Sequence, residues 1–198
     1  HPIAQYNLGV IYYNGIMYSK NTNKGISYFI LSSKYGYIQA HFIVGYLYHE
    51  GKYVNKDITK SIHYYKEGSS FNDQYSKNNL GIIYRYEDGI EQKIGYSVVY
   101  FEEAIRQKND KVSMYNLAHL YIYENIKNTI DESIKLLFNS IKKGFSASIE
   151  LLCIALIKKH KFNFVLIREE LEKQIGCTNE ENDLFLRIIQ TIKSNDSL

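Results

Sequence analysis

Apolar residues recur along this chain at helical spacing, and a two-residue motif divides the pattern into units. The motif pairs an apolar residue with a residue that is small in most copies, and it occurs at Leu8-Gly9, Val44-Gly45, Leu80-Gly81, Leu117-Ala118, Leu152-Cys153 and Leu184-Phe185. Successive copies are 36, 36, 37, 35 and 32 residues apart. A fixed period of this length is typical of solenoids, in which each unit buries its apolar face by stacking on its neighbours.

Within one unit, the pattern predicts two antiparallel helices. In residues 40–75, the apolar positions of a first helix end at Gly51, and Asp57 is placed to cap a second helix. A left-handed turn is expected to end each second helix, at positions 36 residues apart: Gly36, Asn72, Lys108 and Gly144. The predicted fold class is therefore all-α, a right-handed superhelix of about five helix-turn-helix repeats plus a C-terminal helix.

We expect residues 1–198 to form a single repeat domain. The predicted repeats cover approximately residues 4–39, 40–75, 76–112, 113–147 and 148–178, and residues 179–193 form a capping helix. Phe185 fits that cap, because no second helix follows it that would need a small residue. The opening segment His1-Pro2-Ile3-Ala4 reads as the junction of two repeats, so we expect the chain to be part of a longer protein.

Three local features refine the expected helix ends. Gly89 follows Gly81 by eight residues instead of six, which predicts a later end for the first helix of the third repeat. The segments Thr129–Glu132 and Thr178–Glu181 have the spacing of capping boxes, so each is expected to begin a helix.

The small residue of the motif has a structural interpretation. Two helices that cross closely cannot both carry bulky side chains at the contact, which explains Gly9, Gly45, Gly81 and Ala118. Three residues after each of them comes a tyrosine, at Tyr12, Tyr48, Tyr84 and Tyr121. A tyrosine at this position can bury its ring while its hydroxyl bonds to the backbone or to water.

Composition excludes several classes of protein. Hydrophobic residues make up 45% and charged residues 23%, as in ordinary folded chains. The net charge of +3 is dispersed, which argues against nucleic-acid binding. The longest apolar run, Leu151–Ile157, is far shorter than the ~20 residues of a membrane span. The 20 tyrosines and 9 phenylalanines are explained equally well by an AT-rich genome or by a binding surface.

No arrangement of residues points to catalysis, a metal or another cofactor. His41 and His49 are eight residues apart and His63 lies on the next predicted helix, which is not the i, i+4 spacing of a helical metal site. Cys153 and Cys177 are too few for a zinc site or a disulfide framework. We therefore expect no enzyme and a cytoplasmic location. The endoplasmic reticulum lumen or secretion would apply if a leader precedes the chain.

One repeat family resembles this pattern. The spacing Ala4-x-x-x-Leu8-Gly9-x-x-Tyr12-x-x-Gly15, with Tyr28-Phe29 and Gly36 after it, is similar to the Sel-one-like repeat, a helix-pair unit related to tetratricopeptide repeats. The second repeat matches through Gly45, Tyr48, Gly51 and Tyr64-Tyr65. The third keeps Gly81, Tyr84 and Tyr100-Phe101, and the match weakens after residue 146.

The resemblance implies a non-catalytic scaffold or adaptor that binds protein partners, in signalling or in endoplasmic-reticulum quality control. By analogy with related solenoids, first helices line a concave groove that would hold a peptide or helix of the partner. The groove residues would be Tyr6, Val10, Tyr13, Phe42, Tyr46, His49, Asn78, Ile82, Arg85, Tyr115, His119 and Ile122. The alternative is a regulatory or docking arm of a multidomain enzyme, such as a protein kinase, whose catalytic domain lies outside this chain.

Overall fold

The computed structural model describes residues 1–87, 93–124, 126, 129–175, 187–188 and 190–191. It divides the chain into two compact units, residues 1–108 and 109–198. The described residues form an all-α fold whose ten helices are α1 (Pro2–Asn14), α2 (Thr22–Lys34), α3 (Ile38–Glu50), α4 (Ile58–Ser70), α5 (Gln74–Tyr86), α6 (Ile94–Lys108), α7 (Lys111–Tyr123), α8 (Ile130–Lys142), α9 (Ser148–His160) and α10 (Phe164–Ile175).

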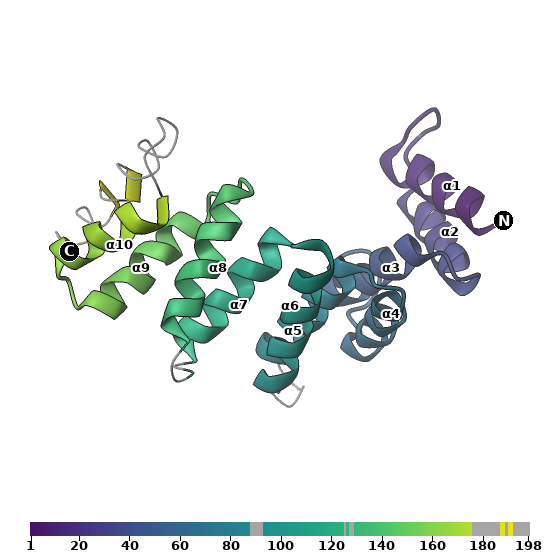
Figure 1. Cartoon of the computed structure of the whole chain (residues 1–198). Coiled ribbons are helices and arrows are strands. Elements are labelled where there is room, and N and C mark those ends of the chain that lie inside the picture. Colours follow the sequence, from purple (N-terminus) through teal and green to yellow (C-terminus); the bar gives the residue numbers. More distant parts are fainter. Residues whose placement is uncertain (88–92, 125, 127–128, 176–186, 189, 192–198) are drawn as a thin grey trace. The chain divides into compact units, whose positions relative to one another are not determined.

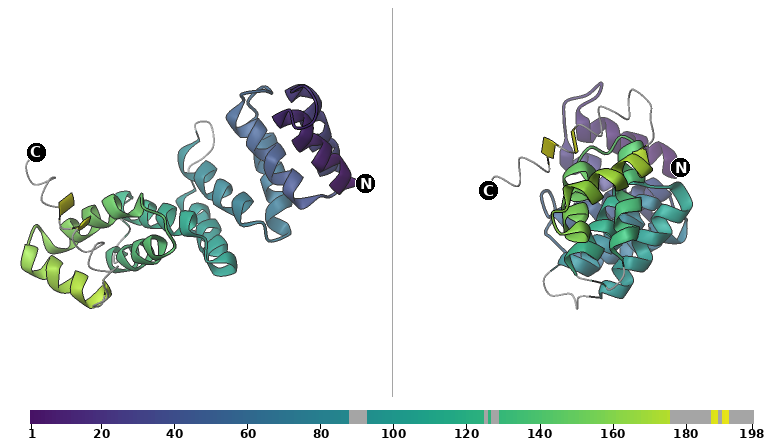
Figure 2. Two further views of the ribbon diagram at one scale, coloured as in Figure 1. Left: turned by 90° about the horizontal axis from the view of Figure 1, so that it is seen from above. Right: turned by 60° about the vertical axis from the view of Figure 1, so that its left-hand side comes forward.

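The helices of the first unit form three pairs, α1 with α2, α3 with α4 and α5 with α6 (Figure 1). The second helix of one pair packs on the first helix of the next, α2 on α3 and α4 on α5. The second unit repeats this order, because α7 pairs with α8, α8 packs on α9 and α9 contacts α10 (Figure 2). The helical repeat array predicted from the motif is thus confirmed.

Most of the predicted helix ends are confirmed. Gly51 follows α3 in the left-handed conformation with φ 67°, which an L side chain rarely adopts. The Asp57 carboxylate accepts a hydrogen bond of 2.9 Å from the backbone N–H of Lys60 and so caps α4. Asn72, two residues after the end of that helix at Ser70, also has a positive φ, 63°. The corresponding turn after α6 is at Asn109, with φ 52°, and not at Lys108, which is the last residue of the helix.

One predicted helix start is confirmed without its capping hydrogen bond, and one predicted helix end is wrong. Thr129 is the N-cap residue of α8, which begins at Ile130, but its hydroxyl donates to the carbonyl of Ile126, 2.7 Å away, and does not cap the helix. The first helix of the third repeat does not end late. It ends at Tyr86, 36 residues after the end of α3 at Glu50. Gly89 and the segment Thr178–Glu181 lie outside the described residues.

The motif glycines of the first unit lie against aromatic rings of the paired second helix. A Cβ atom on Gly9 would be 2.6 Å from the ring of Phe29. At the next two repeats the corresponding distances are 2.7 Å from Gly45 to Tyr65 and 2.5 Å from Gly81 to Phe101. All three rings are buried. A glycine is therefore required here because an aromatic ring occupies the space of its side chain.

Small residues also form the contacts between successive pairs. A Cβ atom on Gly68 of α4 would be 2.4 Å from the hydroxyl oxygen of Ser76 on α5. In the second unit, the Ser148 hydroxyl on α9 donates to the Ser140 hydroxyl on α8, 2.9 Å away. The Ser140 hydroxyl in turn donates to the carbonyl of Lys111, 2.7 Å away. Short side chains at matched positions thus bring each second helix close to the following first helix.

The repeated tyrosines of the first helices are stacked on tyrosines of the second helices and are only half-buried. Their ring centroids are separated by 5.8 Å for Tyr12 and Tyr28, 5.9 Å for Tyr48 and Tyr64, and 5.8 Å for Tyr84 and Tyr100. Tyr121, their equivalent on α7, is also half-buried. In the first unit, the stacked tyrosine pairs stabilise the packing of each first helix on the second helix of the same repeat.

At the end of the second unit, Cys153 replaces the motif glycine and is completely buried. Its thiol lies 3.7 Å from the carbonyl oxygen of Ile188, which is also buried. Of the C-terminal helix predicted over residues 179–193, residues 187, 188, 190 and 191 are described, and these are helical. Phe185 and Cys177 lie outside the described residues.

Candidate partner-binding groove

Most of the predicted groove residues on α1 and α3 are packed against core clusters, and one is exposed. Three of them on α1, Tyr6, Val10 and Tyr13, are half-buried against a cluster of Ile26, Phe29, Val44 and Leu47. On α3, Phe42 packs against the cluster around Tyr65, whereas 46% of the surface of Tyr46 is exposed. Most of these side chains therefore support the packing between repeats.

Polar contacts and burial account for the other predicted residues of α3 and α5. The Nε2 atom of His49 donates to the carboxylate of Glu87, 2.8 Å away, and Lys56 also pairs with that carboxylate. Burial raises the pKa of Glu87, but the bonds from His49 and Lys56 outweigh it and hold this pKa below its usual value. Asn78 and Arg85 are buried, and Ile82 is half-buried.

In the second unit, two predicted residues of α7 line a hollow. Tyr115 and His119 form one wall together with Tyr123, and α9 supplies the other wall through Glu150, Leu151 and Ile154. The three rings follow one another along the helix, with centroids 6.0 Å apart for Tyr115 and His119 and 4.4 Å apart for His119 and Tyr123. This hollow has a volume of about 140 Å³. Ile122, the third residue predicted on α7, is buried.

A second hollow of about 320 Å³ adjoins the first. The two share Tyr115, Ala147 and Glu150, and the second extends to Arg187 and Thr191 near the end of the chain. Together they form a continuous depression along α7 and the start of α9, which we call the α7–α9 groove. Its walls combine aromatic rings and aliphatic side chains with five polar or charged residues, His119, Ser146, Glu150, Arg187 and Thr191, so a partner that binds here would make both apolar and polar contacts.

Glu150 supplies the carboxylate of this groove. It is exposed, and among the residues that the structure describes it has neither a hydrogen bond nor an ion pair. It lies in the first turn of α9, where the helix dipole stabilises a negative charge. The groove is therefore lined by the carboxylate of Glu150 together with the ring of Tyr115.

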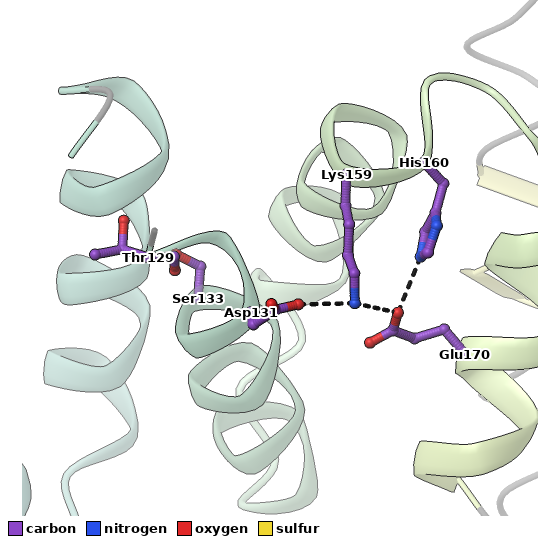
Figure 3. A network of polar contacts seen from close by, with 6 residues as sticks. All are labelled: Thr129, Asp131, Ser133, Lys159, His160 and Glu170. Carbon is purple, nitrogen blue, oxygen red and sulfur yellow. Dashed lines mark hydrogen bonds and ion pairs between the residues drawn. The ribbon is translucent and has the colours of Figure 1, made fainter. Parts of the chain in front are cut away.

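A network of polar contacts outside the groove joins the start of α8, the end of α9 and the middle of α10 (Figure 3). Lys159 lies between Asp131, 2.7 Å away, and Glu170, and its ammonium group pairs with both carboxylates. The Nε2 atom of His160 donates to the same Glu170 oxygen across 2.9 Å. Hydrogen bonding by Lys159 lowers the pKa of Asp131. The charged groups of the network are thus paired with one another, so we interpret the network as stabilising the packing of α8, α9 and α10.

A third hollow of about 380 Å³ lies beside this network. It is lined by Tyr121, Ile122, Ile126, Thr129, Ile130, Lys158 and Lys159. Both of its cations are already bound, because Lys158 donates to the Ile122 carbonyl, 2.9 Å away, and Lys159 is held by the two carboxylates of the network. This hollow therefore lacks a charged group that is available to a ligand.

Neither a metal-binding group of residues nor a membrane-spanning helix occurs in the described part of the chain. Within the described ranges, no three His, Cys, Asp or Glu residues are grouped so that they could hold a metal ion. None of the helices α1 to α10 is long and apolar enough to cross a membrane. The only free cysteine described, Cys153, is buried, and burial raises the pKa of its thiol to about 12.

Comparisons with known proteins place this architecture in a family. The profile of the Sel1 repeat matches residues 2–37, 38–70, 74–109 and 111–125, which is more than half of the chain. The chain belongs to the Sel1 repeat family. Proteins of this family are generally scaffolds for protein interactions and are typically non-catalytic. No curated protein matches the chain.

Two solved structures share the fold. A Sel1 repeat protein from Oxalobacter formigenes is 21% identical, with a TM-score of 0.71 over 86% of this chain and 74% of that one. A protective antigen present in uropathogenic Escherichia coli strains, which displays an SLR fold, is 17% identical, with a TM-score of 0.70. That match covers 98% of this chain and 46% of the antigen, so the chain spans less than half of its length.

Nine residues that line the α7–α9 groove were missed by the sequence analysis. They are Tyr123, Ser146, Ala147, Ile149, Glu150, Leu151, Ile154, Arg187 and Thr191. The repeat period contains the signal for two of them, because Glu150 and Ile154 each follow a predicted groove residue, Tyr115 or His119, by 35 residues. Extending the groove positions into the degenerate fifth repeat would have found them.

Proposed function

We propose that this chain is a non-catalytic scaffold that binds an extended segment of a protein partner in the α7–α9 groove. The observation that carries the proposal is the pair of adjoining hollows that share Tyr115, Ala147 and Glu150. Aromatic side chains give a large contact area at a low cost in conformational entropy, so a row of rings that lines a hollow suits a peptide. The family's general role as an interaction scaffold supports the same function.

The geometry also indicates why the second unit is the better candidate. Tyr6 and Phe42 of the first unit pack against core clusters. Tyr115 also packs on a ring, that of Phe145 with centroids 5.4 Å apart, but in addition it lines both hollows of the second unit. A ring that lines a hollow offers contact area to a partner besides the area that it packs. Binding is thus expected to depend on Tyr115 and His119 more strongly than on Tyr6 or Val10.

The test is capture of peptides by the purified chain from a phage-displayed library of random nonapeptides. Wild-type protein is expected to enrich specific peptides, and a Tyr115→Ala, His119→Ala double variant is expected to lose them. Tyr35→Ala is the matched control, since Tyr35 is 61% exposed and follows α2, outside the groove. Enriched peptides that bind the double variant as well as they bind wild type would place the binding surface elsewhere.

A further inference from the structure

The groove position of the repeat is occupied by a charged residue once along the chain. This position lies three residues before the second residue of the two-residue motif. In the five successive repeats it is occupied by Tyr6, Phe42, Asn78, Tyr115 and Glu150. Three of these five are aromatic and one is an amide. Only in the fifth repeat is the residue charged, and there it lies across the hollow from the aromatic residue of the fourth repeat.

We infer that the α7–α9 groove selects a partner segment carrying a lysine or arginine, whose charged group pairs with Glu150 while its stem lies on Tyr115. This inference rests on the proposed function. The recognition would combine an ion pair with a cation–π contact, because the face of a tyrosine ring carries negative electrostatic potential. The occupant is a basic segment of a protein.

The carboxylate of Glu150 is placed for this role. It is exposed and has neither an ion pair nor a hydrogen bond among the described residues, and it lines both hollows. The other residues along α9 that line the inner hollow, Leu151 and Ile154, are aliphatic. A basic side chain that enters the inner hollow therefore meets one carboxylate, that of Glu150.

The chain itself pairs ammonium groups with tyrosine rings. In the same row of rings, the ammonium nitrogen of Lys158 lies 5.3 Å from the centroid of Tyr123. In the first unit, Lys24 lies 4.0 Å from the ring centroid of Tyr12 and Lys60 lies 5.2 Å from that of Tyr48. Such a contact at Tyr115, supplied by a partner, would repeat a geometry that already occurs at the end of this groove.

The cations near the groove restrict where the basic residue can bind. Lys158 donates a hydrogen bond to the Ile122 carbonyl, 2.9 Å away, and its ammonium group lies over the ring of Tyr123. Arg187 lines the outer hollow and not the inner one. The basic side chain is therefore expected in the inner hollow between Tyr115 and Glu150, where no lining residue is a lysine or an arginine.

The experiment uses the full chain and the same library of displayed nonapeptides. Peptides are selected in parallel on wild type and on Glu150→Lys. Only peptides whose binding depends on Tyr115 are compared. Wild type is expected to enrich peptides with Lys or Arg at one fixed position, and Glu150→Lys is expected to enrich Asp or Glu there. Glu132→Lys is the control, because Glu132 is an exposed carboxylate in the first turn of another helix, α8, outside both hollows.

A selected peptide is then synthesised with its basic residue and with norleucine in its place. Removing the charge or introducing Glu150→Lys is expected to weaken binding about ten-fold each, and the two changes together are expected to cost no more than either. Equal affinity for wild type and Glu150→Lys would overturn the inference, as would Tyr115-dependent peptides without a shared basic residue. In both cases the groove would remain a binding site. If no peptide depends on Tyr115, the proposed function fails and the inference fails with it.

Discussion

The groove position is used differently in the two units of this chain. In residues 1–108, Tyr6 packs on Phe29 and Tyr37, and Phe42 packs on Tyr65 and Tyr75. In residues 109–198, Tyr115 and Glu150 at the same repeat position line hollows, although Tyr115 also packs on Phe145 with centroids 5.4 Å apart. The same repeat position can therefore serve only the packing between helices or also line a hollow, depending on the residues of the neighbouring repeats.

The motif position shows a similar contrast. In the first unit it is always glycine, and each glycine lies against an aromatic ring of the paired helix. In the second unit it is Ala118 and then Cys153, both completely buried. The packing in the first unit thus depends on the absence of a side chain, whereas that in the second unit accommodates one.

The largest expected effect comes from Gly45→Leu or Gly81→Leu. Even a Cβ atom would be 2.7 Å from the ring of Tyr65 or 2.5 Å from that of Phe101, closer than van der Waals contact permits. Each variant should lose about 3 kcal/mol of unfolding free energy by overpacking, measured by urea denaturation. Gly95→Ala is the matched control, because nothing lies within 4 Å of a Cβ atom added there. This helical substitution should add up to about 1 kcal/mol, and a comparable loss from it would refute the packing argument.

The second effect tests the groove position directly. Tyr6→Ala removes a ring that packs on Phe29 and Tyr37, with centroids 5.5 Å and 5.0 Å away, and should cost about 2 kcal/mol of unfolding free energy. Glu150→Ala removes an exposed side chain and should change stability by less than about 0.5 kcal/mol. Urea midpoints of the two variants measure the difference. Equal losses would mean that the position is structural in both units.

The sequence could predict the fold because its information is periodic. The spacing of Gly9, Gly45 and Gly81 is tied to aromatic residues 20 positions later, so the same contact occurs three times. Local capping was predicted where a single side chain decides it, as at Asp57. It failed at Thr129, where the hydroxyl has a competing acceptor in the carbonyl of Ile126.

The groove could be predicted only in part, because burial depends on contacts from outside the repeat. Nothing in one repeat indicates that His49 bonds to Glu87, a residue 38 positions away in the next repeat. The same holds for Asn78, which is buried, and for Tyr46, which is exposed. Glu150 could have been predicted from the sequence, because it occupies the groove position of the fifth repeat. The other features of that repeat match the pattern only weakly.

A smaller effect concerns pH and a buried histidine of the first unit. His41 is 6% exposed, its Nδ1 atom lies 2.8 Å from the Ser33 hydroxyl, and its ring stacks on Phe71. Burial lowers the pKa of His41. Glu67 opposes this shift by raising the pKa, and His63 lowers it further.

The unfolded chain therefore binds a proton on His41 more readily than the folded chain does. Stability from this residue is complete above pH ~6.5, the ordinary pKa of histidine, and falls as the pH decreases below that value. Urea midpoints measured from pH 7.5 to 5.5 should fall more steeply for wild type than for His41→Gln. Parallel pH profiles would show that His41 is not held in its neutral form.

The smallest expected effect is an absence of reactivity at Cys153, the residue that replaces the motif glycine at the end of the second unit. Burial raises the pKa of this thiol to about 12, compared with about 8.5 for an ordinary cysteine, so the fraction of reactive thiolate at pH 8 falls roughly 1000-fold. In a Cys177→Ser variant, which leaves Cys153 as the only thiol, an aromatic disulfide reagent should label the folded chain far more slowly than the chain in urea. Rapid labelling without urea would mean that α9 is open at this position. The contact between Cys153 and Ile188 would then not exclude solvent from the end of the second unit. The motif glycines of the first unit, in contrast, lie in tight contact with the paired helix.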